Sequence, residues 1–375
     1  MPYRNARESR KNEARQKMGS VMTPSSALPI CRATGLLALV AIAGLGLSGA
    51  ARAEACRLRQ IADIPARIAP EHQLLIKVDL NGKPVELRLD TGLGISALSR
   101  ALVQQLGLPM ETAHEQRFQT LENDLAKLFT DPAGEGRNPG FAGSELTERT
   151  RIPRMRLGGA LTEYEEFAVV PVGGDGGDGR PVGVFGMDYL LPYDVELDPA
   201  GGKVKLFEPS DCTEPVVYWA REFSTLPIVV DPVSRWVTME VELDGHRLHG
   251  LIDTGNEFTT LPLGIAGAQF GLSEDSPGMA ASGSDITLEG RTVPRYAYAF
   301  KTLKLGDLVV NNPHVMVETM RFMRHNTSSG THISRAAEVA PDIVIGENLL
   351  RRLHLYFAFR RSVAYFTVVP SPVAN

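Results

Sequence analysis

The chain has 375 residues, of which 43% are hydrophobic, 22% charged and 7% aromatic. This composition argues against wholesale disorder, collagen-like repeats and a polytopic membrane protein, and the length predicts about two domains. The net charge of -5 is unevenly divided, because residues 1–53 carry a net +6 whereas the remaining body carries 31 basic and 42 acidic residues. A body with a net charge of -11 offers no electrostatic footprint for nucleic acid or anionic lipid.

The first predicted element is a leader over residues 1–53. A basic start runs into a short apolar run, Gly35–Leu47, and small residues then lead to Ala51-Arg52-Ala53. This order is typical of a secretory signal peptide, and the apolar run is shorter than the ~18 residues that a spanning helix needs. We therefore expect a secreted or periplasmic protein. It would contact a membrane only through the leader, if the leader stays uncleaved as an anchor.

Cleavage of the leader removes Cys31 and leaves two cysteines, Cys56 and Cys212. In an oxidising compartment an isolated pair is a candidate disulfide. Closing so long a ring stabilises a fold by about 5 kcal/mol before any strain is counted. The alternative is two unrelated thiols; the pair has no zinc-motif spacing.

The body contains a repeated pattern at residues 74–92 and 237–255. Each copy has an alternating strand, an Asn-Gly or Asp-Gly turn, and a second strand that ends in Asp-Thr-Gly. Such turns between alternating runs predict β-hairpins. In both copies the turn glycine precedes the aspartate by eight residues, and the two aspartates, Asp90 and Asp253, lie 163 residues apart.

A second matched pattern follows each hairpin. Residues 182–186 and 343–346 are apolar strands that end in glycine and lead into an apolar helical start. Further strands are predicted after them at residues 193–197 and 204–207 in the first copy, and at 353–357 and 363–366 in the second.

A weaker match joins residues 155–171 to residues 303–318, and both read as strands and turns. Helical periodicity is confined to short stretches such as Ser99–Leu106. The body is therefore predicted to be mainly β, with two similar lobes over residues 54–212 and 213–375.

Two Asp-Thr-Gly strand ends, each followed by an apolar strand that ends in glycine, resemble the pepsin/retropepsin clan of aspartic proteases. The closest resemblance is to its bacterial, single-chain retropepsin-like form, over about residues 60–370. It implies two homologous acid-protease β-barrel lobes related by a pseudo-twofold axis, with Asp90 and Asp253 as the catalytic pair. In the family the threonines hold the two loops together, the glycines after them permit tight turns, and the later glycines lie behind the loops. The corresponding residues here are Thr91, Gly92, Thr254, Gly255, Gly186 and Gly346.

Two carboxylates that share one proton can activate a water and protonate a peptide carbonyl without a metal or another cofactor. The resemblance thus implies an aspartic-type endopeptidase, a monomeric hydrolase acting on peptide or protein substrates. After Asp-Thr-Gly this chain has Leu93-Gly94 and Asn256-Glu257, where the family has small residues. Leu93 would place a bulky side chain beside the pair, and Glu257 would add a charge. The alternative is therefore a catalytically inactive peptide-binding module on the same fold.

Other patterns point to no further chemistry. His246 and His249 would lie on opposite faces of a strand, which disfavours a metal site. The glycine-rich run at 173–179 resembles one calcium-binding nonapeptide, but a single copy lacks the neighbours that complete such a site. Residues 134–140 and 281–285 are either tips of flap hairpins or plain surface loops.

Overall fold

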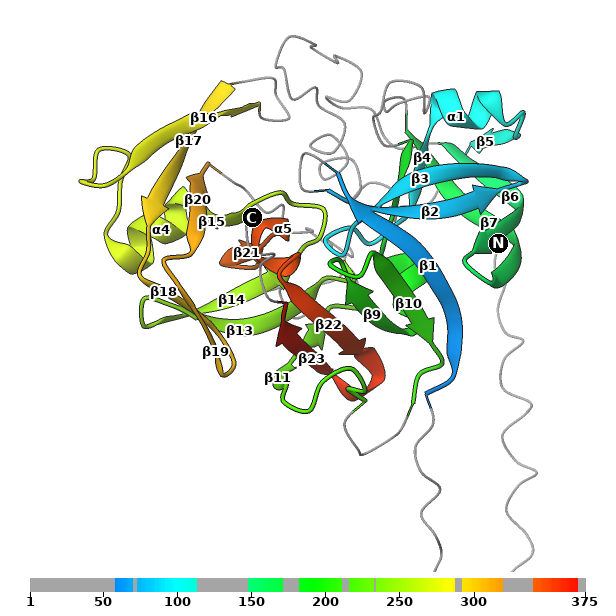
Figure 1. Ribbon diagram of the computed structural model, residues 1–375. Helices are drawn as coiled ribbons and strands as arrows, with labels where there is room; N and C mark the ends of the chain where they lie inside the picture. The colour runs from blue at the N-terminus through cyan, green and yellow to red at the C-terminus, as the bar shows by residue number, and fades with distance from the viewer. Residues whose placement is uncertain are drawn as a thin grey trace, which may run out of the picture. The chain divides into compact units, whose positions relative to one another are not determined.

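Alternating apolar residues make β-strands the main regular structure of the described part of the chain, and its helices are short (Figure 1). The computed structural model describes residues 58–69, 73–112, 148–170, 182–210, 216–232, 234–286, 292–319 and 340–369. All of them belong to one compact unit, residues 55–375. The leader, Cys56, Cys212 and the glycine-rich runs at 134–140 and 173–179 lie outside the described residues.

The strands of the first half are β1 (Gln60–Ile68), β2 (Leu74–Leu80), β3 (Lys83–Leu89), β4 (Ala97–Ser99), β5 (Met110–Thr112), β6 (Glu148–Leu157), β7 (Ala160–Val170), β8 (Gly183–Phe185), β9 (Asp194–Asp198) and β10 (Lys203–Phe207). Those of the second half are β11 (Ser224–Pro227), β12 (Val229–Val230), β13 (Val237–Leu243), β14 (His246–Ile252), β15 (Thr259–Pro262), β16 (Ala280–Ile286), β17 (Thr292–Ala299), β18 (Thr302–Leu305), β19 (Leu308–Asn311), β20 (His314–Glu318), β21 (Ile343–Ile345), β22 (Leu353–Ala358) and β23 (Val363–Val368). The short helices are α1 (Arg100–Gln105), α3 (Met187–Leu190), α4 (Leu263–Phe270), α5 (Glu347–Leu350) and the 3-10 turn η2 (Phe359–Arg361).

The N-terminal lobe, which comprises β2 to β8, is a barrel-like sheet. The strands β2 and β3 form the predicted hairpin, whose turn residues Asn81 and Gly82 have φ values of 55° and 90°. Such left-handed values at both turn positions suit Asn-Gly. β3 pairs in parallel with β8, and β4 in parallel with β7. β6 pairs with β7 and also with β2, and this second pairing closes the sheet on itself.

The C-terminal lobe, which comprises β13 to β21, repeats these pairings. Its hairpin of β13 and β14 turns at Asp244 and Gly245, with φ values of 46° and 86°. β14 pairs in parallel with β21, and β15 in parallel with β20. One difference is that the counterpart of β6 is divided into β17 and β18, with Phe300 and Lys301 between them. The mainly β fold with two barrel-like lobes is therefore confirmed.

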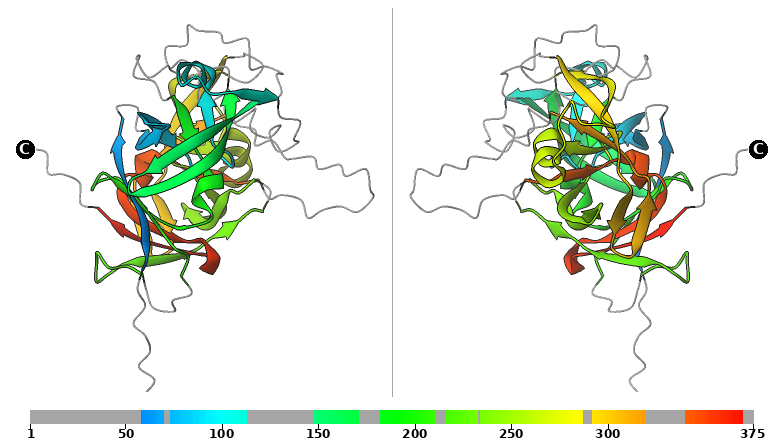
Figure 2. Two further views of the ribbon diagram at one scale, coloured as in Figure 1. Left: turned by 90° about the vertical axis from the view of Figure 1, so that its right-hand side faces the viewer. Right: turned by 90° about the vertical axis from the view of Figure 1, so that its left-hand side faces the viewer.

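A sheet shared by both halves joins the lobes. Its strand order is β11-β23-β22-β9-β10-β1, and β9 of the first half pairs with β22 of the second (Figures 1 and 2). β1 then continues into the N-terminal lobe by pairing with β2. The predicted division between residues 212 and 213 falls outside the described residues and stays a prediction.

Residues 281–285, considered above as a flap tip, lie within β16, which pairs with β17 through an irregular register between Ala281 and Ser284. Both alternatives, a flap tip and a plain surface loop, were wrong for residues 281–285, because these residues lie within a strand that continues past them.

A buried charge holds the centre of the shared sheet. Glu196 on β9 is fully buried; it accepts hydrogen bonds from Lys205 Nζ at 2.8 Å and Tyr218 Oη at 2.6 Å, and lies 3.0 Å from His354 Nε2. Burial alone would raise the pKa of Glu196, but hydrogen bonds with His354, Lys205 and Tyr218 together hold that pKa below its ordinary value. The network links a strand of the first half to His354 on β22 of the second.

Glu196→Gln should lower the free energy of unfolding by about 3 kcal/mol at neutral pH, because it removes one partner of a buried ionic network. The loss should shrink as the pH falls through the lowered pKa of Glu196, where the wild-type carboxyl is protonated too. Urea unfolding measures both effects. The control Glu208→Gln, in an exposed pair with Arg59, should cost less than about 1 kcal/mol. An equal loss in the two variants would contradict the role of Glu196.

Candidate active site

Each Asp-Thr-Gly loop begins where a hairpin strand ends. The N–H of Asp90 donates to Phe185 O and that of Asp253 to Ile345 O, both at 3.0 Å, so the parallel ladders with β8 and β21 extend to the aspartates. Within each loop the glycine N–H donates to its own aspartate Oδ1, at 3.0 Å from Gly92 and 2.8 Å from Gly255. The two loops therefore present their carboxyl groups in the same way.

Reciprocal hydrogen bonds tie the two loops together across the lobes. The N–H of Thr91 donates to Thr254 Oγ1 and the N–H of Thr254 donates to Thr91 Oγ1, both at 3.1 Å. The hydroxyl of Thr91 then donates to Ile252 O at 2.8 Å, and that of Thr254 to Leu89 O at 2.9 Å. Both threonines are buried, so these four bonds form without competition from water.

The glycines of the two loops let the carboxyl groups meet. A Cβ at Gly92 would collide with the carboxylate of Asp253, and a Cβ at Gly255 with that of Asp90. Both glycines lie in turns. Neither has a positive φ, so the feature that requires glycine at these positions is close approach to the opposite aspartate. Each loop thus packs against the carboxyl group of the other lobe.

The two carboxyl groups are electrostatically coupled. Burial raises the pKa of Asp253 well above its ordinary value, and the neighbouring charge of Asp90 raises it further. The N–H of Gly255 and the guanidinium of Arg88 oppose these effects. Asp253 therefore retains a proton at a pH where an exposed aspartate has lost it.

Gly186 and Gly346 lie directly behind the loops, at the starts of α3 and α5. A Cβ at Gly186 would collide with Leu93 O, and a Cβ at Gly346 with Phe258 O. The next N–H in each copy donates back to the loop, from Met187 to Leu93 O and from Glu347 to Asn256 O, at 2.8 Å each.

Polar pairs that the sequence analysis missed support these glycines. In the first copy Ser96 Oγ accepts from the N–H of Gly186 and donates to Asp188 Oδ1. In the second copy Thr259 Oγ1 accepts from Gly346 N–H and donates to Asn348 Oδ1. The signal was present in the spacing. Each hydroxyl residue lies six positions after its aspartate, and each partner lies two positions after its glycine.

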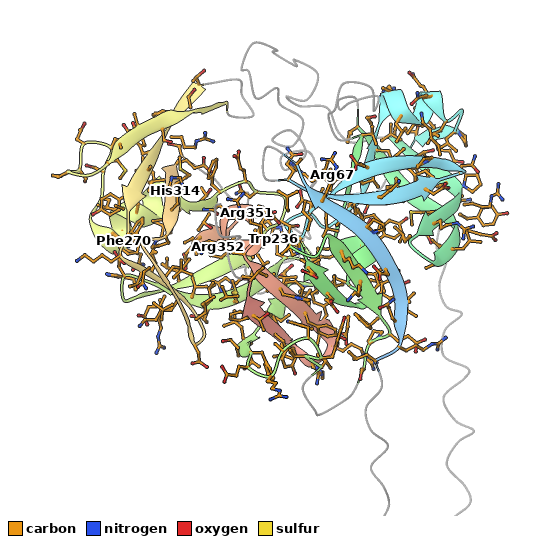
Figure 3. The ribbon with its side chains drawn as sticks, in the orientation of Figure 1. Arg67, Trp236, Phe270, His314, Arg351 and Arg352 are labelled. Carbon is orange, nitrogen blue, oxygen red and sulfur yellow. The ribbon has the colours of Figure 1, made fainter. Side chains whose placement is uncertain are left out.

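The two departures from the family pattern lie in different environments. Leu93 is 2% exposed, so its side chain packs in the interior. Glu257 is partly exposed. Two side chains of the C-terminal half also hydrogen-bond to the Asp90 loop. Trp236 Nε1 donates to Gly92 O at 2.9 Å, and Arg235 donates to Gly94 O. Trp236 is labelled near the centre of Figure 3.

Two buried charged residues beside the pair were not predicted. Arg88 Nη2 lies 3.1 Å from Asp90 Oδ2, and both side chains are buried. Glu347 is 1% exposed, and neither carboxyl oxygen has a hydrogen-bond partner among the described residues. Burial, and then the charge of Asp253, raise the pKa of Glu347 to about 8. Arg88 corresponds to Leu251 in the second copy, and Glu347 corresponds to Met187 in the first, so each charge occurs in one lobe only.

The histidine pair does not converge on a site. The ring of His246 packs against Phe270 at 4.7 Å, whereas His249 Nδ1 lies 3.5 Å from Glu240. Within the described ranges, no three His, Cys, Asp or Glu side chains cluster closely enough to hold a metal ion. No helix in that part of the chain is long and apolar enough to cross a membrane.

Comparison with known proteins supports a resemblance to aspartyl proteases. Residues 76–127 match the family model described as aspartyl protease; the match includes Asp90 and ends before Asp253. No curated protein matches the chain in sequence.

Solved structures show only weak similarity. The basic 7S globulin from soybean is 10% identical, with a TM-score of 0.42, over 83% of this chain and 95% of its own. The protein edgp is 12% identical, with a TM-score of 0.43, over 84% of this chain and 96% of its own. Conglutin gamma, a basic 7S globulin from lupine seeds, is 12% identical, with a TM-score of 0.43, over 83% of this chain and 95% of its own. Similarity at this level does not bear on activity.

Thr91→Val and Thr254→Val should each lower the free energy of unfolding by about 2–3 kcal/mol, because valine keeps the shape and leaves buried backbone groups without partners. The double variant should lose less than the sum, since the four bonds form one network. Urea unfolding is the measurement. The control Thr238→Val removes one longer bond, to Val229 O at 3.3 Å, and should cost less than about 1 kcal/mol. Additive losses would contradict a single network.

Glu347→Met should remove a pH dependence of stability. Folding raises the pKa of this carboxyl from 4.5 to about 8. Below pH 4.5 the group is protonated in both states and makes stability independent of pH; as the pH rises from there toward about 8, the folded state loses stability because the unfolded state ionises first. Through this group the wild type should lose roughly 3 kcal/mol between the unfolded value and pH 7. Urea unfolding across that range tests this, with Glu163→Gln at an exposed position of β7 as control. Parallel wild-type and Glu347→Met curves would exclude the effect.

Proposed function

We propose that the chain is an aspartic-type endopeptidase in which Asp90 and Asp253, one from each lobe, activate the attacking water. The observation that carries the proposal is the meeting of the two carboxyl groups, with each glycine of one loop against the aspartate of the other. We further propose that the two lobes arose by internal duplication. The protein would act as a monomer after export to the periplasm or the medium. The match to the aspartyl protease model over the first loop supports the proposed activity.

The pair has the protonation behaviour that this reaction needs. At ~4 Å and an effective dielectric near 20, two ionised carboxylates repel by about 4 kcal/mol, which separates their titrations by about three pH units. Between those two titrations the pair holds a single proton. It can then act as base and acid at once.

The reaction follows from that state. The ionised carboxylate takes a proton from water as the water oxygen bonds to the peptide carbonyl carbon, and the protonated carboxyl gives its proton to the carbonyl oxygen. The resulting diol collapses when one carboxylate takes back a hydroxyl proton and the other carboxyl protonates the nitrogen. The C–N bond breaks to give an acid and an amine, and the pair again holds one proton.

A second candidate is a peptide-binding module without turnover. The ion pair between Arg88 and Asp90 favours it, because that guanidinium occupies one oxygen of a carboxylate that would otherwise face the water. Peptide binding without cleavage across acidic and neutral pH would support this candidate.

Asp90→Asn and Asp253→Asn should each lower kcat/KM for a denatured protein or peptide library by at least about 1,000-fold, because either change removes the shared proton site. Mass spectrometry of the products at several pH values measures the loss. The control Asp307→Asn, at an exposed position between β18 and β19, should cleave like the wild type. Substantial cleavage by either active-site variant would overturn the proposed function.

A further inference from the structure

Arg88 is placed to act on the dyad. Arg88 lies in β3, which ends at Leu89, and Asp90 follows directly. Side chains two residues apart in extended backbone point to the same side, which brings Arg88 next to Asp90. The Arg88 residue is 5% exposed, its Nη2 lies 3.1 Å from Asp90 Oδ2, and its Nε has no partner among the described residues. Burying a guanidinium costs several kcal/mol of solvation free energy. Within the described residues, the ion pair that offsets this cost for Arg88 is the one with Asp90.

The C-terminal lobe has no counterpart to this charge. The matching residue, Leu251, is buried in an apolar cluster with Trp236 and Val344. The two aspartates therefore differ in their donors. Asp90 accepts from Arg88 and from the N–H of Gly92, whereas the donor found for Asp253 within the described residues is the N–H of Gly255. Asp90 thus has a charged hydrogen-bond donor that Asp253 lacks among the described residues.

The other charged groups around the dyad do not reverse this asymmetry. Glu347 on α5 lies close enough to feel the charge of Asp253, and Arg351 at the end of α5 offsets part of that repulsion. Asp188 on α3 accepts two hydrogen bonds from Ser96, and the charge of Arg235 favours the ionised form of Asp188. Among the described residues around Asp253, Arg88 is the cation whose charge opposes the rise in the pKa of that aspartate. The remaining acidic residue nearby, Glu257, belongs to the Asp253 loop itself.

We propose that Arg88 is a positioning residue that keeps the negative charge of the dyad on Asp90 and the shared proton on Asp253, and that it thereby sets the pH range of turnover. The inference rests on the proposed function of the pair and assigns its roles. Asp90 takes the proton from water, and Asp253 gives its proton to the carbonyl oxygen.

The first test is the pH profile of kcat/KM for wild type, Arg88→Gln and Arg88→Lys. Removing a buried cation beside two carboxylates makes both hold protons more tightly, so both limbs of the Arg88→Gln profile should move to higher pH by about one to three units. Arg88→Lys keeps the positive charge but loses the planar guanidinium, so it should shift the profile less than Arg88→Gln does. The control Arg59→Gln, in an exposed pair, should not shift it. A folded Arg88→Gln variant with a wild-type profile would overturn the inference.

A second measurement does not depend on turnover. Carbon-13 NMR of labelled aspartate carboxyls follows the titration of the dyad directly, with Asp253→Asn assigning the signals. In the wild type the last proton should leave from Asp253, and in Arg88→Gln, or in Arg88→Lys if the first variant does not fold, both titrations should move upward. A last proton on Asp90, or unchanged titrations, would refute the role of Arg88. Absence of cleavage with the expected titrations would instead refute the proposed function alone.

Discussion

Two carboxyl groups lie close together at the junction of the lobes, and they repel each other whenever both are ionised. The threonine bonds hold the Asp90 and Asp253 loops together from both sides. Glycines at 92 and 255 remove the atoms that would keep the loops apart. The sheet shared by the two halves adds a second attachment between them, through the pairing of β9 with β22.

The dyad is built from two similar loops in unlike surroundings. Hydrogen bonds within and behind the loops match in both copies, from the threonines to the hydroxyl pairs with Asp188 and Asn348. The charges differ, because Arg88 approaches the pair from the N-terminal lobe and Glu347 from the C-terminal lobe. The backbone symmetry thus brings the carboxyl groups together, and the lobe-specific charges give the two groups different electrostatic surroundings.

Much of this arrangement could be predicted from the sequence, because it depends on short-range patterns. The hairpins follow from alternating residues around Asn-Gly and Asp-Gly, and Asp90 and Asp253 follow from their matched positions after them. The close approach of each loop glycine to the opposite aspartate was not predicted, since contacts across lobes are invisible in a linear pattern. Arg88 was overlooked because an alternating strand predicts a solvent-facing residue there, whereas the folded chain leaves it only 5% exposed.

The central claim is that one site is formed by both carboxyl groups. The most direct measurement is a crystal structure of the mature chain with a peptide whose scissile bond is replaced by a tetrahedral hydroxyl-bearing carbon, which mimics the transition state. The account predicts one peptide per chain, with its hydroxyl within hydrogen-bonding distance of both the Asp90 and the Asp253 carboxyl groups. A peptide bound elsewhere, or a hydroxyl in contact with only one of the two aspartates, would contradict it.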